Sequence, residues 1–178
     1  MRPTMVLIAI GMLFRSGCAD DPTSSKHGEQ VAYFSFEQAA DTTGWEWFLP
    51  HGIISDHAPG CGRRALFVHG GNTHPAARVT IGPMAEGGHY RFSVWAKVIG
   101  RDTLLLGSIS LGLQPHSLGD TIARVKVNDR MWRYWVSGET SYCRAGGRLR
   151  LYIMAASFFD TASAGMVVDG IGVHRTKD

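Results

Sequence analysis

The sequence has little charge, few cysteines and no long stretch with helical periodicity. Asp, Glu, Lys and Arg make up 19% of its 178 residues, and the formal net charge is +3. It contains no block of lysine or arginine and no basic helix, so nothing in it supports nucleic-acid binding. After residue 30, apolar residues recur with period two far more often than with period 3.6, which argues against a helical bundle.

The motifs of several enzyme classes are also missing. No H-E-x-x-H, cupin-like H-x-H or C-x-x-C motif accompanies the eight histidines, which we interpret as surface-loop residues. No G-x-S-x-G motif and no glycine-rich loop opening a helix is present, so acyl transfer and nucleotide binding have no support. The acids lie mostly at turns, whereas glycoside hydrolysis requires two carboxylates across a sugar. We therefore expect that the protein is not an enzyme.

Glycine, by contrast, is abundant, with 22 residues that separate short apolar runs. Eight or nine of these runs have the alternation and the length of strands. They cover residues 31–37, 64–70, 77–82, 89–98, 106–114, 121–127, 131–139, 148–156 and 165–175. The pattern predicts an all-β fold, an antiparallel β-sandwich or jelly roll.

The first residues have the features of an export signal. A basic start, an apolar stretch from Met5 to Phe14 and small residues before Cys18 indicate a secretory signal peptide over residues 1–17. The ending SGC resembles a bacterial lipobox, in which the cysteine is lipidated, although Arg15 stands where leucine is usual. The alternative is an ordinary cleavage site with an incidental cysteine.

This leader sets the expected domain organisation and location. Residues 18–29 would be the lipidated cysteine and a flexible polar linker, and residues 30–178 a single β-sandwich domain. A lipid anchor would place the protein in the cell envelope, on the outer membrane or cell surface. Secretion or periplasmic release is the alternative.

Export also implies an oxidising compartment, in which Cys61 and Cys143 can pair. Both lie beside glycine-rich turns, which favours a disulfide over two buried thiols. Because the closed loop would be long, the bond would stabilise the fold by roughly 3–4 kcal/mol.

One face of the predicted strands is polar but contains large aromatics. Trp95, Gln114, Arg150 and Tyr152 lie opposite the core positions of their strands. Aromatic rings among amides and charges suit stacking on a flat, polar ligand. The alternative is that this face packs under a loop, or that Trp95 belongs to a second core layer.

A set of motifs in chain order resembles the carbohydrate-binding modules of the family 4/9/22 type, within the galactose-binding-like jelly rolls. The matching pieces are FSFE (34–37), GW (44–45), GCGRRALFV (60–68), EGGHYRFSVWAKV (86–98), RMWRYWVSGETSY (130–142), and RLRLYIMA followed by GMVVDGIGV (165–173). The resemblance spans nearly the whole expected domain. Two departures stand out: the usual Asn-Gly before the Phe-Glu pair is absent, and Gly170 replaces the second acid of the closing motif.

The resemblance implies a structural calcium ion and a glycan-binding face. The calcium positions correspond to Glu37 and Asp169, and calcium prefers carboxylate and carbonyl oxygens. The alternative is that both are exposed strand-end acids. For the binding face, the resemblance points to five residues: Trp95, Gln114 and Tyr152, with Lys97 and Arg150 as further polar contacts.

Most of the other large aromatics are expected to pack in the core. The resemblance implies that Trp45 packs against the sandwich, and it leaves Trp47 open. Neighbouring valines favour an inward orientation of Trp132 and Tyr134.

The sequence thus predicts a non-catalytic, surface-tethered lipoprotein that binds poly- or oligosaccharide, alone or beside a partner enzyme or envelope protein. One alternative is a structural or adhesive lipoprotein that uses the sandwich for protein or cell-wall contacts. A small glycan hydrolase or lyase is a further alternative.

Overall fold

The computed structural model describes residues 28–71, 75–82, 88–100, 106–113, 121–141, 148–156 and 164–177. In chain order its elements are β1 (Glu29–Phe34), the 3-10 helix η1 (Ala39–Thr42), β2 (Trp45–Trp47), β3 (His51–Ile54), β4 (Ala65–His69), β5 (Ala77–Ile81), β6 (His89–Ile99), β7 (Leu106–Leu113), β8 (Thr121–Lys126), β9 (Arg133–Val136), β10 (Thr140–Ser141), β11 (Leu149–Ala156) and β12 (Gly165–Lys177). Every predicted run contains a strand, and β2, β3 and β10 are additional short strands. In these ranges no helix is long and apolar enough to cross a membrane.

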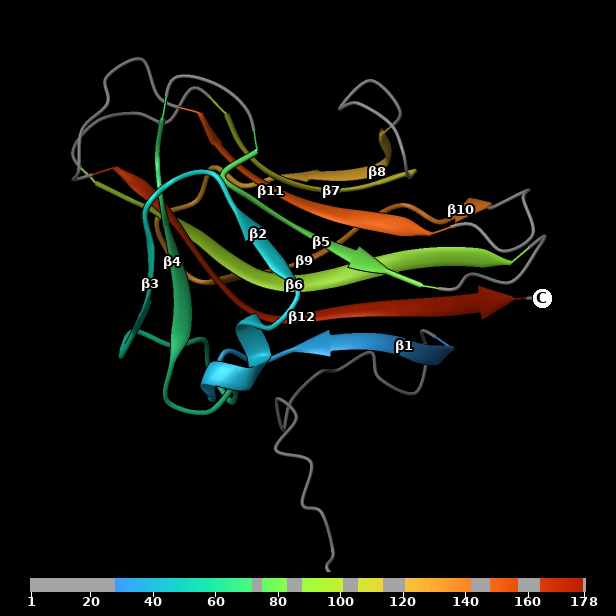
Figure 1. Ribbon diagram of the computed structural model, residues 1–178, viewed down its shortest axis with the longest axis horizontal. Helices are drawn as coiled ribbons and strands as arrows, with labels where there is room; N and C mark the ends of the chain where they lie inside the picture. The colour runs from blue at the N-terminus through green and yellow to red at the C-terminus, as the bar shows by residue number, and fades with distance from the viewer. Residues whose placement is uncertain are drawn as a thin grey trace, which may run out of the picture.

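The strands form two antiparallel sheets (Figure 1). We call sheet A the layer with the order β10-β6-β12-β4-β3, in which β1 also pairs with β12 and β9 with β6. Sheet B has the order β2-β5-β11-β7-β8. Non-consecutive strands are neighbours in both sheets, as in a jelly roll, so the predicted all-β fold is confirmed.

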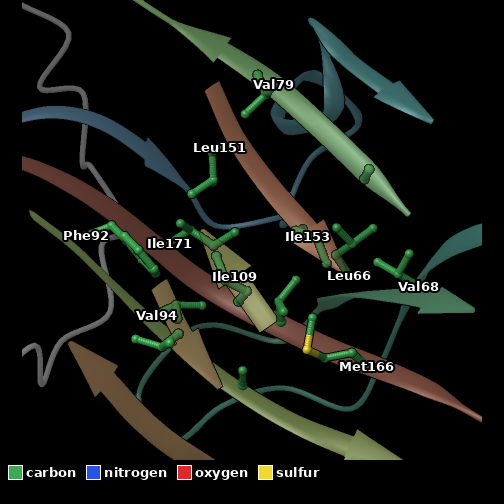
Figure 2. Close-up of a cluster of buried hydrophobic side chains, with 14 of the residues drawn as sticks. Leu66, Val68, Val79, Phe92, Val94, Ile109, Leu151, Ile153, Met166 and Ile171 are labelled. Carbon is green, nitrogen blue, oxygen red and sulfur yellow. The ribbon is translucent and has the colours of Figure 1, made fainter. Parts of the chain in front are cut away.

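The core lies between the two sheets, where their inward residues meet (Figure 2). Phe92 and Val94 of β6 and Met166 of β12 face Ile109 of β7 and Leu151 of β11, and all five are fully buried. Burial of each such side chain stabilises the fold by about 1.5–3 kcal/mol. The period-two alternation of these strands therefore correctly identified their core positions.

The aromatics near β2 close one part of this core. Trp45 is 6% exposed, and it meets the Phe34 ring edge-on at 5.2 Å, which agrees with its expected structural role. The Trp47 ring stacks on Trp45 at 5.5 Å and on His51 at 3.7 Å, between ring centroids. Trp47 is half-buried and packs against the core.

The expectation for β9 is wrong. Trp135 packs against the core, whereas Tyr134 lies beside Trp95 on the outer face. The nearby Val136 is 39% exposed, so an apolar neighbour did not mark the buried side of this short strand.

Candidate functional site

The structure divides the predicted glycan-binding residues between the two sheets. Trp95 and Lys97 belong to β6 of sheet A, whereas Arg150 and Tyr152 belong to β11 of sheet B. Gln114 lies outside the described residues. Each described residue alternates with core residues as expected, but the outer faces of two packed sheets point in opposite directions. The predicted set is therefore corrected to two separate groups.

The outer face of sheet A is covered near its centre by the segment that follows β3. The Asp56 carboxylate lies 2.6 Å from Nζ of Lys97 and accepts a hydrogen bond from Nε1 of Trp132 at 3.1 Å. Lys97 also lies 4.9 Å from the centre of the Trp132 ring. On this face Val167 is fully buried. The protein's own chain thus occupies much of this surface.

Trp95 lies within this covered region. It is half-buried, and its ring lies 5.3 Å from that of Tyr134, its cross-strand neighbour on β9. Its indole Nε1 is buried and donates no hydrogen bond to the described residues. The alternative, that this face packs under a loop, is therefore correct in part. Only part of the Trp95 ring is accessible for stacking on a ligand.

The outer face of sheet B has a row of polar side chains across adjacent strands. Glu46 on β2 is opposite Arg78 on β5, which is in turn opposite Tyr152 on β11. Nη2 of Arg78 lies 2.6 Å from Oε2 of Glu46, and this hydrogen bond lowers the pKa of the Glu46 carboxyl. Tyr152 is only 3% exposed, so its ring is not a stacking surface in this structure.

An exposed aromatic does lie beside this row. Phe48 follows β2 and is 48% exposed, and the Arg78 guanidinium lies 5.0 Å from its ring centre. Sequence reasoning did not select Glu46, Phe48 or Arg78. The signal for Arg78 was available, because it alternates with the core residues Ala77 and Val79.

A second candidate centre contains the two acids predicted to bind calcium. Phe36 is fully buried with a φ of 60°, a left-handed conformation that costs a non-glycine residue of order 1–3 kcal/mol. This bend directs Glu37 toward the segment before β4. Oε1 of Glu37 there accepts hydrogen bonds from the backbone N–H groups of Arg63 and Arg64, both at 2.8 Å.

Asp169 reaches the same region from β12. The pairing of β12 with β6 shifts register after Asp169, where Gly170 has a φ of 53°, and such bulges redirect side chains. Asp169 is fully buried and accepts hydrogen bonds from the N–H groups of Ala58 at 3.1 Å and Gly170 at 2.8 Å. It is thus not an exposed strand-end acid.

The surroundings of Asp169 favour the neutral form of its carboxyl group. Burial and, to a smaller extent, the nearby Glu37 carboxylate raise its pKa to about 7, although the two backbone hydrogen bonds act in the opposite direction. Two neighbouring acids in a closed site fit a bound cation, which would favour both ionised forms. No group of three or more His, Cys, Asp or Glu side chains is suitably placed among the described residues, so further ligands would be backbone carbonyls.

Cys61 anchors the segment between the two acids. It is 3% exposed and disulfide-bonded, and its N–H donates to the carbonyl of Ala58 at 3.1 Å. Cys143 lies outside the described residues, so its pairing with Cys61 stays a prediction. A disulfide here limits the movement of the segment that holds Glu37 and Asp169.

The fold is an antiparallel β-sandwich of the jelly-roll type, and solved structures of carbohydrate-binding modules share it. The CBM22-1 xylan-binding domain of Paenibacillus barcinonensis Xyn10C matches with a TM-score of 0.59 and 18% identity, over 86% of this chain and 98% of that one. The C-terminal family 22 carbohydrate-binding module of Clostridium thermocellum Xyn10B matches with a TM-score of 0.56 and 18% identity, over 83% and 93%. At these identities the comparison establishes the fold. No protein-family model matches the sequence, and no curated protein matches it.

Proposed function

We propose that the protein is a non-catalytic carbohydrate-binding module that holds a glycan on the outer face of sheet B. The observation that supports this most is the cluster of the exposed Phe48 and Glu46 with the half-buried Arg78 on that face, in a fold shared with xylan-binding modules. On sheet B the proposed contacts lie at β2 and β5, because Tyr152 on the central strand β11 is only 3% exposed. On sheet A the segment that follows β3 covers the outer face near Lys97 and Trp132.

The chemistry of the cluster suits a sugar. The face of the Phe48 ring can pack against the C–H groups of a pyranose. The guanidinium of Arg78 donates hydrogen bonds and the Glu46 carboxylate accepts them, so together they can satisfy hydroxyl groups. Their 2.6 Å contact fixes both side chains before a ligand arrives.

Affinity electrophoresis and calorimetry with xylan, β-glucan and other polysaccharides test this proposal. The variant Phe48→Ala should weaken binding by about 3- to 10-fold, as expected for loss of an aromatic contact. Trp95→Ala, on the opposite sheet, is the matched comparison and should change affinity little. Loss of binding with Trp95→Ala alone would move the site to sheet A, and no binding to any glycan by the folded protein would refute the function.

A structural or adhesive role in the envelope is the second candidate. The observation that favours it is the partial covering of Trp95, together with the exposed Met131 on the segment beside it, which is 70% accessible. Apolar surface next to half-buried aromatics suits a protein partner. Cross-linking in cells that is lost with Met131→Glu, with glycan binding absent, would support this candidate.

We also propose that Glu37 and Asp169 hold a structural calcium ion with backbone carbonyls of the surrounding segments. The burial of Asp169, its raised pKa and the neighbouring acid support this site. Thermal melting with and without a chelator tests it, with Glu37→Gln as the variant. The side-chain amide oxygen that this substitution introduces can still accept the two backbone hydrogen bonds, so the variant should fold and lose the calcium response. An unchanged midpoint of the wild type would refute the site.

Finally, we propose that the domain is tethered to the cell envelope through a lipid on Cys18. The support is the sequence SGC after an apolar stretch. Metabolic labelling with a fatty acid should label the wild type and not Cys18→Ser. A protein that appears unlabelled in the medium would instead be secreted.

A further inference from the structure

Positive charge is concentrated on the outer face of sheet B. Arg78 on β5 and Arg150 on β11 alternate with core residues, as do Arg124 and Lys126 on β8. Arg148, just before β11, alternates with the buried Leu149 and so lies on the same side. Among the described residues of this face, the only carboxylate is Glu46.

The described residues of this face thus contain five cations and one carboxylate, a larger positive balance than the formal +3 of the whole chain. Sheet A differs, since its described cations are close to acids. Arg91 lies 3.2 Å from Glu139 and Lys97 lies 2.6 Å from Asp56. The imbalance is thus a property of one face rather than of the protein as a whole.

The cations are arranged along a row that crosses the sheet. Arg78, Tyr152, Ser110 and Arg124 are successive cross-strand partners on β5, β11, β7 and β8. At a strand spacing of about 4.8 Å, Arg78 and Arg124 are roughly 14 Å apart along this row. The next partners on β11 and β7 are Arg150 and Gly112, so positive groups flank positions occupied by small residues.

Arg150 is the best placed of these cations to bind an anion. It is half-buried, and within the described part of the chain no acid forms a salt bridge with it. Its Nε is buried without a hydrogen-bond partner there, and such an unsatisfied donor is costly. It is close enough to Glu46 to lower the pKa of that carboxyl, after the larger effects of Arg78.

From this geometry we infer that the ligand of sheet B is an acidic polysaccharide whose sugars bear carboxylates, with Arg150 binding a carboxylate directly. A planar guanidinium matches a carboxylate in a two-point contact, and the basic residues around it attract the rest of the chain. The inference rests on the proposed glycan-binding function and specifies its substrate class.

A matched pair of polymers tests the inference. Glucuronoxylan is compared with the same polymer after its carboxylates have been reduced to alcohols, which leaves the backbone unchanged. The full chain should bind the acidic polymer at least 10-fold more tightly, and this preference should decline between about 20 and 300 mM salt. Sulfated and unsulfated uronate polymers are included, and a preference for sulfate would overturn the assignment of a carboxylate.

Two substitutions test which face of the protein causes the preference for the acidic polymer. Arg150→Met should reduce affinity for the acidic polymer about 10-fold and leave affinity for the reduced polymer unchanged. Arg133→Gln removes a cation from sheet A and should affect neither. Equal, salt-independent binding of both polymers would refute the inference while the proposed function stands, whereas no glycan binding would refute both. Equally tight binding of DNA or anionic vesicles would show a general polyanion surface instead.

Discussion

The buried carboxyl of Asp169 makes a strong prediction about pH. Its pKa rises from 3.8 to about 7 on folding, so the calcium-free folded protein binds more protons than the unfolded chain between these values. The contribution of this carboxyl group to stability therefore falls as pH rises through this window. With these two pKa values, Asp169 alone lowers the free energy of unfolding by about 2–3 kcal/mol between pH 5 and pH 8. For a domain of this size that corresponds to roughly 5–10 °C in Tm.

Bound calcium should offset the loss of stability at high pH. A cation at Glu37 and Asp169 favours the ionised carboxylates, so it must compete with the proton at pH 5 and far less at pH 8. With a pKa of about 7, apparent calcium affinity at pH 5 should be about 100-fold weaker than at high pH. The increase in Tm on adding calcium should accordingly be larger at pH 8.

Denaturant titrations and thermal melts at pH 5 and pH 8, with chelator or with calcium, measure both effects. Asp169→Asn is the control, because it cannot titrate at this position while every histidine still does. The difference in free energy of unfolding between wild type and Asp169→Asn should change with pH by the full amount predicted for Asp169. Parallel curves for the two chelated proteins would refute the assignment of the raised pKa to Asp169.

Three further predictions concern stability. Gly62→Ala should destabilise the fold by more than Gly44→Ala, and it alone should weaken the calcium response. Both glycines have positive φ, but a Cβ at Gly62 would collide with Oε1 of Glu37, whereas one at Gly44 meets nothing within 4 Å. Equal losses in denaturant titrations would contradict this. Cys61→Ser should lower the free energy of unfolding by about 2–5 kcal/mol, and wild type under reducing conditions should show a similar loss. Trp45→Ala should cost about 3–5 kcal/mol, measured against Trp132→Phe, and a loss below about 1 kcal/mol would show that β2 is not part of the core.

The fold was predictable because nearly every long strand alternates apolar and polar residues. A rise of about 3.3 Å per residue and a period of two leave little choice about which side of HYRFSVWAKV is buried. Glu37 lies near enough to Asp169 to raise the pKa of that carboxyl, and the calcium site that the resemblance implies at these two acids stays a prediction. What alternation cannot specify is the sheet in which each strand lies, and for that reason Trp95 and Tyr152 were wrongly assigned to one face.

The misassignment in the short strand β9 has a different origin. Its aromatics Tyr134 and Trp135 are adjacent, so they point to opposite sides of the strand and the pattern has no clear apolar face. The outer side of this region is shaped by the segment containing Asp56, which is distant in sequence and holds the Trp132 indole by a hydrogen bond. Such contacts depend on the path of a loop, which local patterns do not determine.

The central position of β12 has a consequence for how the protein folds. β1, β4 and β6 all pair with this one strand, and in Figure 1 it runs the length of the sheet. Since β1 and β12 are separated by most of the sequence, the N-terminal strand has no partner until β12 has left the ribosome. A chain with such distant pairings folds slowly, and sheet A cannot be completed before its last strand has been synthesised.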